Sequence, residues 1–366
     1  MTALPAALDG TGPAALPLPA ERGLRATIVG ALQPALSVAL ERDDVALVVA
    51  TSGMSASPKG VMLTASALLR SAAAAHERLG GVGQWLLALP THHIAGVQVL
   101  VRSIVGGRDP VVMDLTRGFS TEAFVAATSL VTAERRYTSL VPTQLARLLD
   151  GNAIDALRAY DAVLVGGAAP LPGLIERAQR RGVNVVLTYG LSETCGGCVY
   201  DGLPLDEVSV ALTDGGRIVV GGPTVFAGYL GRPDLTAQTL VGGRVVTQDL
   251  GRIDSSGRLE VLGRMDDVVV SGGENVSLPA VETALSERSD IAEAAAIGLP
   301  DDDWGQRVVV FVVALSTIDD ADVRAAVVAR LGRAAAPRDV IVVHELPRTG
   351  PGKVDRRALR AMAMQR

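Results

Sequence analysis

The chain has 366 residues, a formal net charge of −5 and 48% apolar residues, of which few are aromatic. This length is too great for one small core and predicts two domains. The mildly negative charge argues against a nucleic-acid-binding surface, which needs a basic footprint. No basic segment followed by an apolar one opens the chain, and no apolar run reaches the ~18 residues of a membrane helix, so we expect a cytoplasmic protein without membrane insertion.

The first half of the chain alternates between apolar runs and segments of high helix propensity. The expected helices are residues 21–40, 64–79, 94–105, 119–130, 143–149 and 174–181. The expected strands are residues 45–50, 85–89, 111–113, 137–141, 162–165 and 183–188. This alternation predicts a parallel α/β sheet, and ligands of such sheets bind beyond the carboxyl ends of the strands.

From about residue 208 the pattern changes to short β segments with glycine turns, which predicts a small β subdomain. Beyond Gly263 a further unit begins, with expected strands at 268–270, 294–297 and 308–313 and expected helices at 279–287 and 319–330. We therefore expect an α/β fold with a large N-terminal domain at 1–264. A small, mobile α+β domain at 265–366 would follow it.

A Gly/Ser-rich stretch, TSGMSASPKG at Thr51–Gly60, follows the first expected strand. Such a turn can bind phosphate, because small residues let backbone N–H groups approach the phosphate oxygens and a lysine supplies charge. It is not a Walker A loop, since Pro58 and not glycine precedes Lys59. Taken alone, it is either a nucleotide-binding loop or a flexible surface turn.

The same stretch resembles the phosphate-binding loop of the adenylate-forming superfamily, which includes acyl-CoA synthetases, luciferases and peptide-synthetase adenylation domains. The usual pattern is Thr/Ser-Ser-Gly-Ser/Thr-Thr-Gly-x-Pro-Lys-Gly. This chain departs from it at Met54, where a hydroxyl is usual, and at Ala56, where glycine is usual. The resemblance implies that ATP binds to the rest of the loop, namely Thr51, Ser52, Gly53, Ser55 and Lys59.

The segment YGLSE at Tyr189–Glu193 follows another expected strand. A carboxylate at a strand end could hold Mg²⁺, although a lone glutamate in a turn is usually solvated. The segment resembles the family's Tyr-Gly-x-Thr-Glu motif, with Ser192 in place of threonine. The resemblance implies that Tyr189 and Gly190 lie against adenine, Ser192 contacts the α-phosphate, and Glu193 is a catalytic residue that holds the metal.

Three further segments resemble ATP-site motifs of the family. The turn at Gly166, Gly167 and Ala168 resembles the second nucleotide-facing turn, although alone it could equally be a plain strand-to-helix turn. Asp249 matches the aspartate of a Thr-Gly-Asp motif and is the implied acceptor for both ribose hydroxyls. Arg264 would reach the ribose or a phosphate.

The C-terminal part carries motifs that the family uses for domain motion and for its second reaction. Asp266 falls at the position about which the small domain swings. The loop at Gly272, Gly273 and Glu274 resembles the one that faces the site during thioester formation. Lys353, in PRTGPGK, resembles the catalytic lysine, which contacts ATP and can act as a point charge on a phosphate.

The acyl site is indicated by residues 89–96, LPTHHIAG, which resemble the family's Pro-x-x-His-x-x-Gly motif. His93 takes the histidine position that lines the acyl pocket in relatives and is a predicted catalytic residue, with Gly96 beside it. Alternatively, the adjacent histidines could merely cap the following helix.

Arg102 lies in an apolar stretch, one helical turn after Gln98. A buried guanidinium needs an anion, which is either a structural Asp or Glu or a second carboxylate on the substrate. In the o-succinylbenzoate–CoA ligases of menaquinone synthesis, an arginine at this spacing from the acyl-site histidine is linked to the second role. The compact length and residues 192–202 also resemble the short actinobacterial version of these enzymes.

The cysteines are Cys195 and Cys198, in a C-x-x-C spacing. This spacing could indicate a redox pair or half of a zinc site. Neither interpretation finds support, because a second pair of ligands is missing and the histidines are dispersed.

The resemblance covers residues 45–357 and implies a ligase that joins o-succinylbenzoate to coenzyme A in two steps, using Mg²⁺ and ATP. Adenylation would release pyrophosphate, and the small domain would then swing so that the coenzyme A thiol displaces AMP. Three alternatives stay open: another aryl or fatty acid as substrate, a carrier protein as acceptor, or a non-catalytic nucleotide-binding relative. We expect small-molecule partners and no nucleic acid, and a homodimer is left open.

Overall fold

The computed structural model describes residues 3–36, 44–51, 58–151, 153–170, 173–349 and 353–365. The chain divides into two compact units. The first comprises Met1–Thr247 and Ile253–Glu260, and the second comprises Gln248–Arg252 and Val261–Arg366. The division falls inside strands β14 (Arg244–Ile253) and β15 (Leu259–Arg264). The expected border between residues 264 and 265 lies just after β15 and stays a prediction.

The first unit is built on a seven-stranded sheet with the strand order β4-β3-β5-β6-β7-β8-β9. The strands up to β7 are parallel, and β8 and β9 extend the sheet in antiparallel fashion. Their bounds are Gln84–Leu87 (β3), Val111–Val112 (β4), Arg136–Leu140 (β5), Ala162–Gly166 (β6), Val185–Leu191 (β7), Gly196–Tyr200 (β8) and Leu203–Pro204 (β9). The expectation of a parallel α/β sheet is confirmed for this part of the chain.

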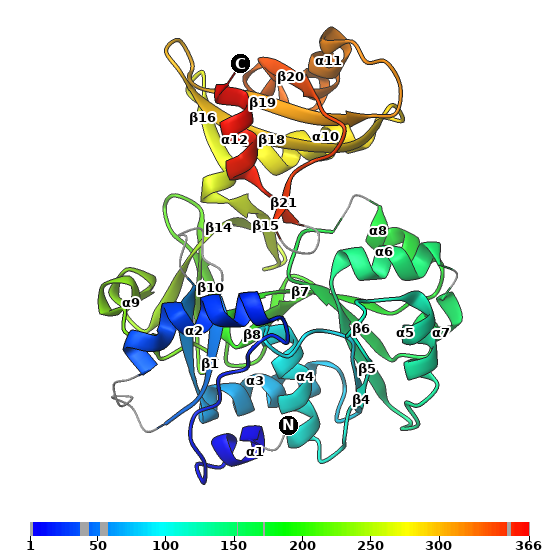
Figure 1. Ribbon diagram of the computed structural model, residues 1–366, viewed down its shortest axis with the longest axis vertical. Helices are drawn as coiled ribbons and strands as arrows, with labels where there is room; N and C mark the ends of the chain where they lie inside the picture. Colours follow the sequence, from blue (N-terminus) through cyan, green and yellow to red (C-terminus); the bar gives the residue numbers. More distant parts are fainter. Residues whose placement is uncertain are drawn as a thin grey trace. The chain divides into compact units, whose positions relative to one another are not determined.

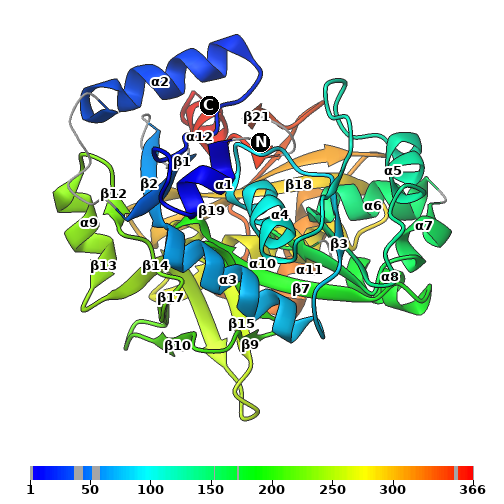
Figure 2. The same ribbon diagram turned by 90° about the horizontal axis from the view of Figure 1, so that it is seen from below.

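Alternate residues of these strands belong to two different cores, as the period of two requires. Trp85 and Leu87 of β3 join one core with helices α3 (Ala65–Arg78) and α4 (Ile94–Val105). Leu86 joins the other core, which α5 (Thr121–Thr128), α6 (Pro142–Asp150), α7 (Ile154–Arg158) and α8 (Leu174–Arg180) cover. Helices therefore lie on both faces of the sheet (Figure 1), with α3 and α4 packed side by side (Figure 2).

The first expected strand does not belong to the parallel sheet, which corrects the sequence analysis. β1 (Val45–Thr51) pairs antiparallel with β2 (Lys59–Thr64), and β2 pairs antiparallel with β12 (Gly228–Tyr229). The apolar run of β1 is buried on both faces, which is also typical of parallel strands, so the run alone did not reveal its neighbours. Thr51 and Lys59, the described ends of the Gly/Ser-rich stretch, therefore lie on paired antiparallel strands.

The first unit has further helices and another sheet. Helix α1 spans Ala3–Leu8, α2 spans Arg22–Leu36 and α9 spans Pro233–Thr239. A five-stranded sheet contains β10 (Ser209–Leu212), β11 (Arg217–Gly221), β14 and β13 (Leu240–Val241) in that order, with β15 paired to β14. This sheet is the expected small β subdomain, and its last two strands lead into the second unit.

The main sheet of the second unit has helices on both faces, and β21 (Arg348–Thr349) and β22 (Lys353–Val354) form a separate two-stranded sheet. The strands of the main sheet are β16 (Val268–Ser271), β17 (Glu274–Ser277), β18 (Ile291–Asp301), β19 (Gly305–Ala314) and β20 (Asp339–Val342). Helices α10 (Leu278–Ser286) and α11 (Asp320–Leu331) share a core with one face, and Leu359 of α12 (Arg356–Met364) packs with the other. Among the helices of the described ranges, none combines the length and apolarity that a bilayer crossing requires.

Candidate active site

The carboxyl ends of the parallel strands bring several predicted site residues to one edge of the main sheet. β6 ends at Gly166, which is in register with Thr188 of β7. β7 continues through Tyr189 and Gly190 and leads into the 3-10 helix η1 (Ser192–Thr194). Since parallel strands end at the same edge, the two ATP-site motifs are neighbours, as expected from the sequence.

Two glycines of these motifs are required by the packing of the sheet. A Cβ on Gly166 would collide with the Thr188 side chain, and a Cβ on Gly190 would overlap the carbonyl oxygen of Gly196 in β8. Tyr189 and Gly190 therefore lie within a strand and not in a turn after it, which corrects the sequence analysis. Gly167 and Ala168 are exposed in the turn after β6 and are the residues of this motif that are accessible to a ligand.

Lys59, Tyr229 and Glu193 form a cluster that joins the hairpin sheet to the end of β7. The Tyr229 hydroxyl donates a hydrogen bond of 2.6 Å to Glu193 Oε1. Lys59 Nζ lies 4.9 Å from the centroid of the Tyr229 ring, within the range of a cation–π contact. Burial and the neighbouring Glu193 carboxylate raise the pKa of Tyr229, so its hydroxyl stays protonated and can act as the donor.

This cluster fits a magnesium and phosphate site in its chemistry. Glu193 is half-buried and held by Tyr229, so it is not the solvated turn residue of the alternative interpretation. A carboxylate beside a lysine supplies one ligand for Mg²⁺ and one charge for phosphate oxygens. Tyr229 was not predicted from the sequence, because its strand has two residues and lies far along the chain from its partner β2.

The Gly/Ser-rich loop is described only at its ends. Thr51 and Lys59 pair across the hairpin. Thr51 Oγ1 is buried and has no hydrogen-bond partner among the described residues, so a hydroxyl is available at the base of the loop. The predicted ATP-binding residues Ser52, Gly53 and Ser55 lie outside the described residues.

His93 and Gly96 lie where β3 leads into α4. His93 occupies the N-cap position of α4, but its side chain makes no capping hydrogen bond, so capping does not explain this histidine. Its ring centroid lies 4.2 Å from that of His92. The His93 side chain is exposed, and the nearby protein atoms that displace part of its water lower the pKa of its imidazole. Gly96 is buried in the first turn of the helix.

Arg102 lies on the buried face of α4 and is 3% exposed. Its guanidinium donates to the Tyr200 hydroxyl at 3.0 Å and lies 4.9 Å from the centroid of the Trp85 ring. Arg102 Nε has no hydrogen-bond partner, and no Asp or Glu forms an ion pair with Arg102, within the described part of the chain. The structural carboxylate that the sequence analysis left open is therefore not found there.

The surroundings of Arg102 also leave an acceptor unused. Gln98, one turn earlier, donates to the Cys195 carbonyl oxygen at 2.7 Å, while its Oε1 is buried without a partner in the described ranges. His76 accepts a hydrogen bond from Trp85 Nε1 at 3.4 Å. Burial, followed by the positive charge of Arg102, lowers the pKa of His76 to about 4. His76 is therefore neutral at neutral pH and does not compensate the charge of Arg102.

The second unit holds the other predicted ATP and hinge residues. Asp249 is buried in β14, and its Oδ1 lies 3.5 Å from Arg264 Nη1. The two predicted ribose contacts are thus neighbours within this unit. Asp266 lies in the 3-10 helix η2 (Met265–Asp267), directly after β15.

The thioester-loop and lysine motifs are both β-hairpins. Gly272 and Gly273 form a two-residue turn between β16 and β17, and both have positive φ, which favours glycine there. Glu274 follows and is exposed. Lys353 begins β22 (Lys353–Val354), which pairs antiparallel with β21 (Arg348–Thr349).

Cys195 and Cys198 are free thiols in a buried environment. Burial raises the pKa of both, and that of Cys198 reaches about 11. The thiolates that metal binding and disulfide exchange require are therefore disfavoured at neutral pH. The cysteines pack in the core around β8.

A parallel α/β unit with glycine, tyrosine and glutamate motifs at its carboxyl edge, followed by a smaller α+β unit with a Gly-Pro-Gly-Lys motif, defines the class of two-unit adenylate-forming enzymes. The model of the AMP-binding enzyme family matches residues 6–230, and the model of the AMP-binding enzyme C-terminal domain matches residues 280–353. The chain belongs to the AMP-binding enzyme family.

Known proteins narrow this class. The probable 2-succinylbenzoate–CoA ligase of Mycobacterium tuberculosis (strain ATCC 25618 / H37Rv) is 46% identical over 368 residues, which cover 98% of this chain and 94% of that protein. The o-succinylbenzoate CoA synthetase of Bacillus subtilis, solved in complex with its acyl-adenylate intermediate, superposes with a TM-score of 0.78 at 29% identity, over 86% of this chain and 69% of that one. The same Bacillus protein with ATP and magnesium gives a TM-score of 0.76 at 29% identity, over 86% of this chain and 70% of that one.

Proposed function

We propose that the protein ligates 2-succinylbenzoate (o-succinylbenzoate) to coenzyme A at the expense of ATP, through an acyl-adenylate intermediate and with release of AMP and pyrophosphate. This is a step of menaquinone biosynthesis. Support comes from a relative that is alike over nearly its whole length and from a Bacillus structure with the acyl adenylate.

The choice of substrate rests on one observation: Arg102 is buried and no carboxylate among the described residues pairs with it. A guanidinium that is 3% exposed and has no carboxylate partner among the described residues is costly, since charge is removed from water without compensation. 2-Succinylbenzoate has two carboxylates: one is activated, and the other is available to pair with Arg102. The unpaired N–H of Arg102 Nε is a further donor for that carboxylate.

In the first step, an oxygen of the activated carboxylate attacks the α-phosphorus of ATP. A P–O bond forms, the bond to the pyrophosphate leaving group breaks, and pyrophosphate departs with the electron pair. Lys353 would neutralise charge that builds up on the oxygens around the phosphorus. Tyr189, the turn at Gly166–Ala168, Asp249 and Arg264 would hold the nucleoside part.

Magnesium would be held by Glu193, with Tyr229 fixing the carboxylate and Lys59 close by. The ion would supply charge compensation to the phosphate oxygens of ATP. Glu193 is half-buried and has one side-chain donor among the described residues, Tyr229, so it retains lone pairs for such a ligand. His93 and Gly96 would line the acyl pocket at the start of α4.

In the second step, the coenzyme A thiol, as thiolate, attacks the acyl carbon of the adenylate. A C–S bond forms, the bond between the acyl carbon and the phosphate oxygen breaks, and AMP leaves. We propose that the chain pivots at Asp266 between the steps, so that the Gly272–Glu274 hairpin replaces Lys353 near the reacting atoms. The domain border at residues 264 and 265 is part of this proposal.

The test supplies the enzyme with ATP, Mg²⁺ and 2-succinylbenzoate and offers either coenzyme A or a carrier protein as acceptor. We expect 2-succinylbenzoyl-CoA and AMP by mass spectrometry, and a far weaker reaction with benzoate or a medium-chain acid. Acylation of the carrier alone would change the acceptor, and preference for a monoacid would change the substrate. Absence of ATP–pyrophosphate exchange with every acid would indicate a non-catalytic relative.

The place of action and the assembly are part of the same proposal. We expect the enzyme to act in the cytoplasm on small molecules. A homodimer, left open by the sequence, is tested by sedimentation of the purified protein.

A further inference from the structure

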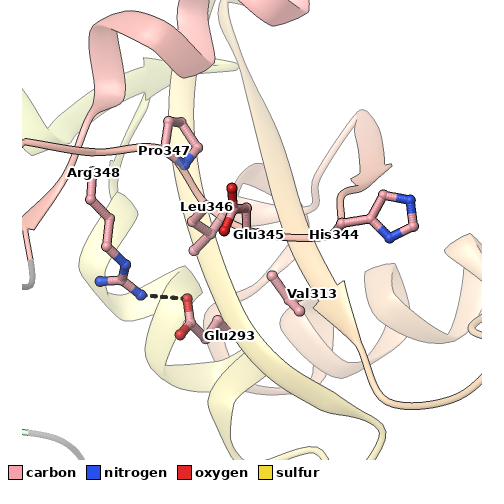
Figure 3. Close-up of a pocket in the computed structure, with 7 residues that line it drawn as sticks. All are labelled: Glu293, Val313, His344, Glu345, Leu346, Pro347 and Arg348. Carbon is pink, nitrogen blue, oxygen red and sulfur yellow. Dashed lines mark hydrogen bonds and ion pairs between the residues drawn. The ribbon is translucent and has the colours of Figure 1, made fainter.

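The segment that carries Lys353 is fixed at both of its strands. In β21, Arg348 forms an ion pair with Glu293 of β18, at 2.6 Å between Nη2 and Oε2 (Figure 3). Directly after β22, the amide of Asp355 donates to the Pro347 carbonyl oxygen at 2.7 Å. Asp355 also caps α12 by accepting from the amides of the next turn. The two strands are thus joined to each other beside Pro347 and Asp355, and Arg348 connects them to β18.

Arg356, the first residue of α12, connects this hairpin to two other elements. Its Nη1 lies 2.6 Å from Asp267 Oδ1 in η2, and its Nη2 lies 2.7 Å from Glu282 Oε1 in α10. Glu282 Oε1 also accepts a hydrogen bond of 2.8 Å from the amide of Ala296 in β18. One guanidinium thus links the element after Lys353 to α10, to β18 and to the segment that begins with the predicted pivot.

The two ion pairs of Arg356 are strong because Arg356 and both carboxylates are largely shielded from water. The side chains of Arg356, Asp267 and Glu282 are 28%, 15% and 24% exposed. Charge-assisted hydrogen bonds in such surroundings are shorter and stronger than those at a surface, and they fix the geometry of a planar guanidinium. Burial raises the pKa of Glu282, and the Arg356 guanidinium opposes that rise.

The next residue, Arg357, shows that the ion pairs to Asp267 and Glu282 are specific to position 356. Arg357 follows Arg356 in the same helix but is exposed, and no ion pair joins it to any residue in the described ranges. Charge near Lys353 is therefore available without Arg356. What Arg356 adds is a fixed connection between α12 and η2.

We propose that Arg356 is a positioning residue for adenylation: through Asp267 and Glu282 it holds the Lys353 hairpin rigidly against the segment that follows the pivot. A rotation at Asp266 would then carry Lys353 as part of one rigid body. This inference rests on the proposed function, because it assumes that Lys353 acts in adenylation. Without the connection, the lysine would be delivered less accurately, and a misplacement of about 1 Å can cost on the order of 10²-fold in rate.

The experiment compares Arg356→Met with the matched control Arg357→Met in the full-length enzyme. Adenylation is measured by ATP–pyrophosphate exchange, and thioester formation is measured from synthetic 2-succinylbenzoyl adenylate and coenzyme A. We expect Arg356→Met to slow exchange by roughly 10–10²-fold and to leave thioester formation within about threefold, while Arg357→Met changes neither. Arg356→Lys should fall between, since an ammonium cannot bridge both carboxylates in the same way.

A double variant separates positioning from general stability. If Arg356 acts through Lys353, adding Arg356→Met to Lys353→Ala should not slow exchange further, because the group being positioned is already gone. An equal additional loss in that background, or an equal loss in both half-reactions, would overturn the inference. Should Arg356→Met fail to fold, Asp267→Asn removes one of the two ion pairs and is expected to give the same pattern at smaller size.

The same data distinguish this inference from the proposed function. If Lys353→Ala leaves exchange intact, the role of the lysine in the proposed function is wrong, whatever Arg356 does. If Lys353→Ala abolishes exchange while Arg356→Met behaves like Arg357→Met, only the positioning role fails.

Discussion

Two arginines, one in each unit, are shielded from water. They differ in whether carboxylates of the protein pair with their positive charge. Arg356 holds Asp267 and Glu282 with its two terminal nitrogens. Arg102 is more deeply buried, yet it contacts only the Tyr200 hydroxyl and the Trp85 ring among the described residues. The fold itself compensates the first charge, whereas no carboxylate among the described residues compensates the second. A buried charge that the fold does not compensate is therefore a better indicator of a binding site than a buried charge as such.

The largest expected effect is on the KM of an Arg102 variant, and it should depend on whether the substrate has a second carboxylate. Arg102→Met should raise KM for 2-succinylbenzoate by roughly 10²-fold, because a charge-assisted contact to the second carboxylate is lost. KM for benzoate, which lacks that carboxylate, should stay within about twofold. Steady-state kinetics with both acids check this, and the exposed Arg108 (Arg108→Met) serves as a control. An equal rise in KM for both acids would mean that Arg102 supports the pocket without contacting the substrate.

The same comparison predicts opposite effects on stability. Arg356→Met leaves two shielded carboxylates without their cation and should lower the free energy of opening of α12 and β18 by about 2–3 kcal/mol. Arg102→Met removes an uncompensated charge and should change the stability of the first unit by less than about 1 kcal/mol in the absence of substrate. Hydrogen exchange resolved by peptide measures both. Strong destabilisation by Arg102→Met would reveal a structural partner for Arg102.

Acid sensitivity should also depend on Arg102. The pKa of His76 is lowered to about 4 by burial and by Arg102, whereas in the unfolded chain it is about 6.5. The unfolded state therefore binds the extra proton first, and the stability of the first unit should fall by about 3 kcal/mol as the pH drops from about 6.5 to about 4. Above pH ~6.5 the histidine is neutral in both states and contributes no pH dependence.

The measurement is urea unfolding at several pH values. The chain has two tryptophans, so in a Trp304→Phe background the fluorescence of Trp85 reports the first unit alone. His76→Gln keeps an acceptor for Trp85 and removes the titration, so the difference between it and the parent isolates the histidine. Arg102→Met should shrink that difference, because the like charge is gone. An unchanged difference would show that burial alone sets the pKa of His76.

The smallest expected effect concerns the donor to Glu193. Tyr229→Phe keeps the ring beside Lys59 but removes the hydroxyl, and we expect the Kd of Mg-ATP to rise by about 3–10-fold, equivalent to about 1 kcal/mol. Isothermal titration measures this. Tyr160→Phe removes a comparable buried hydroxyl, 2.8 Å from Thr128 Oγ1, at a place without predicted site residues, and it should leave the Kd unchanged. An equal Kd for both variants would place the cluster outside the Mg-ATP site.

Local sequence patterns were sufficient to predict those helices and strands whose bounds depend on their own residues. The helix at residues 94–105 was predicted with the bounds that α4 has, because this stretch is mostly apolar and ends at Gly106 and Gly107. The strands of the parallel sheet were found to within a few residues for the same reason. The motifs at Gly166 and at Tyr189–Glu193 were expected at one edge of that sheet, and β6 and β7 are indeed adjacent and parallel.

The sequence by itself determined the class of the enzyme, the order of its motifs and most of the elements that carry them, since these depend on residues close together in the chain. Only the tertiary structure decided which strands pair and which charges are compensated. It moved β1 out of the parallel sheet, brought Tyr229 to Glu193, and left Arg102 without a carboxylate among the described residues while it gave Arg356 two. The physical reason is that strand pairing and ion pairing join residues distant in sequence, whose proximity no local pattern records.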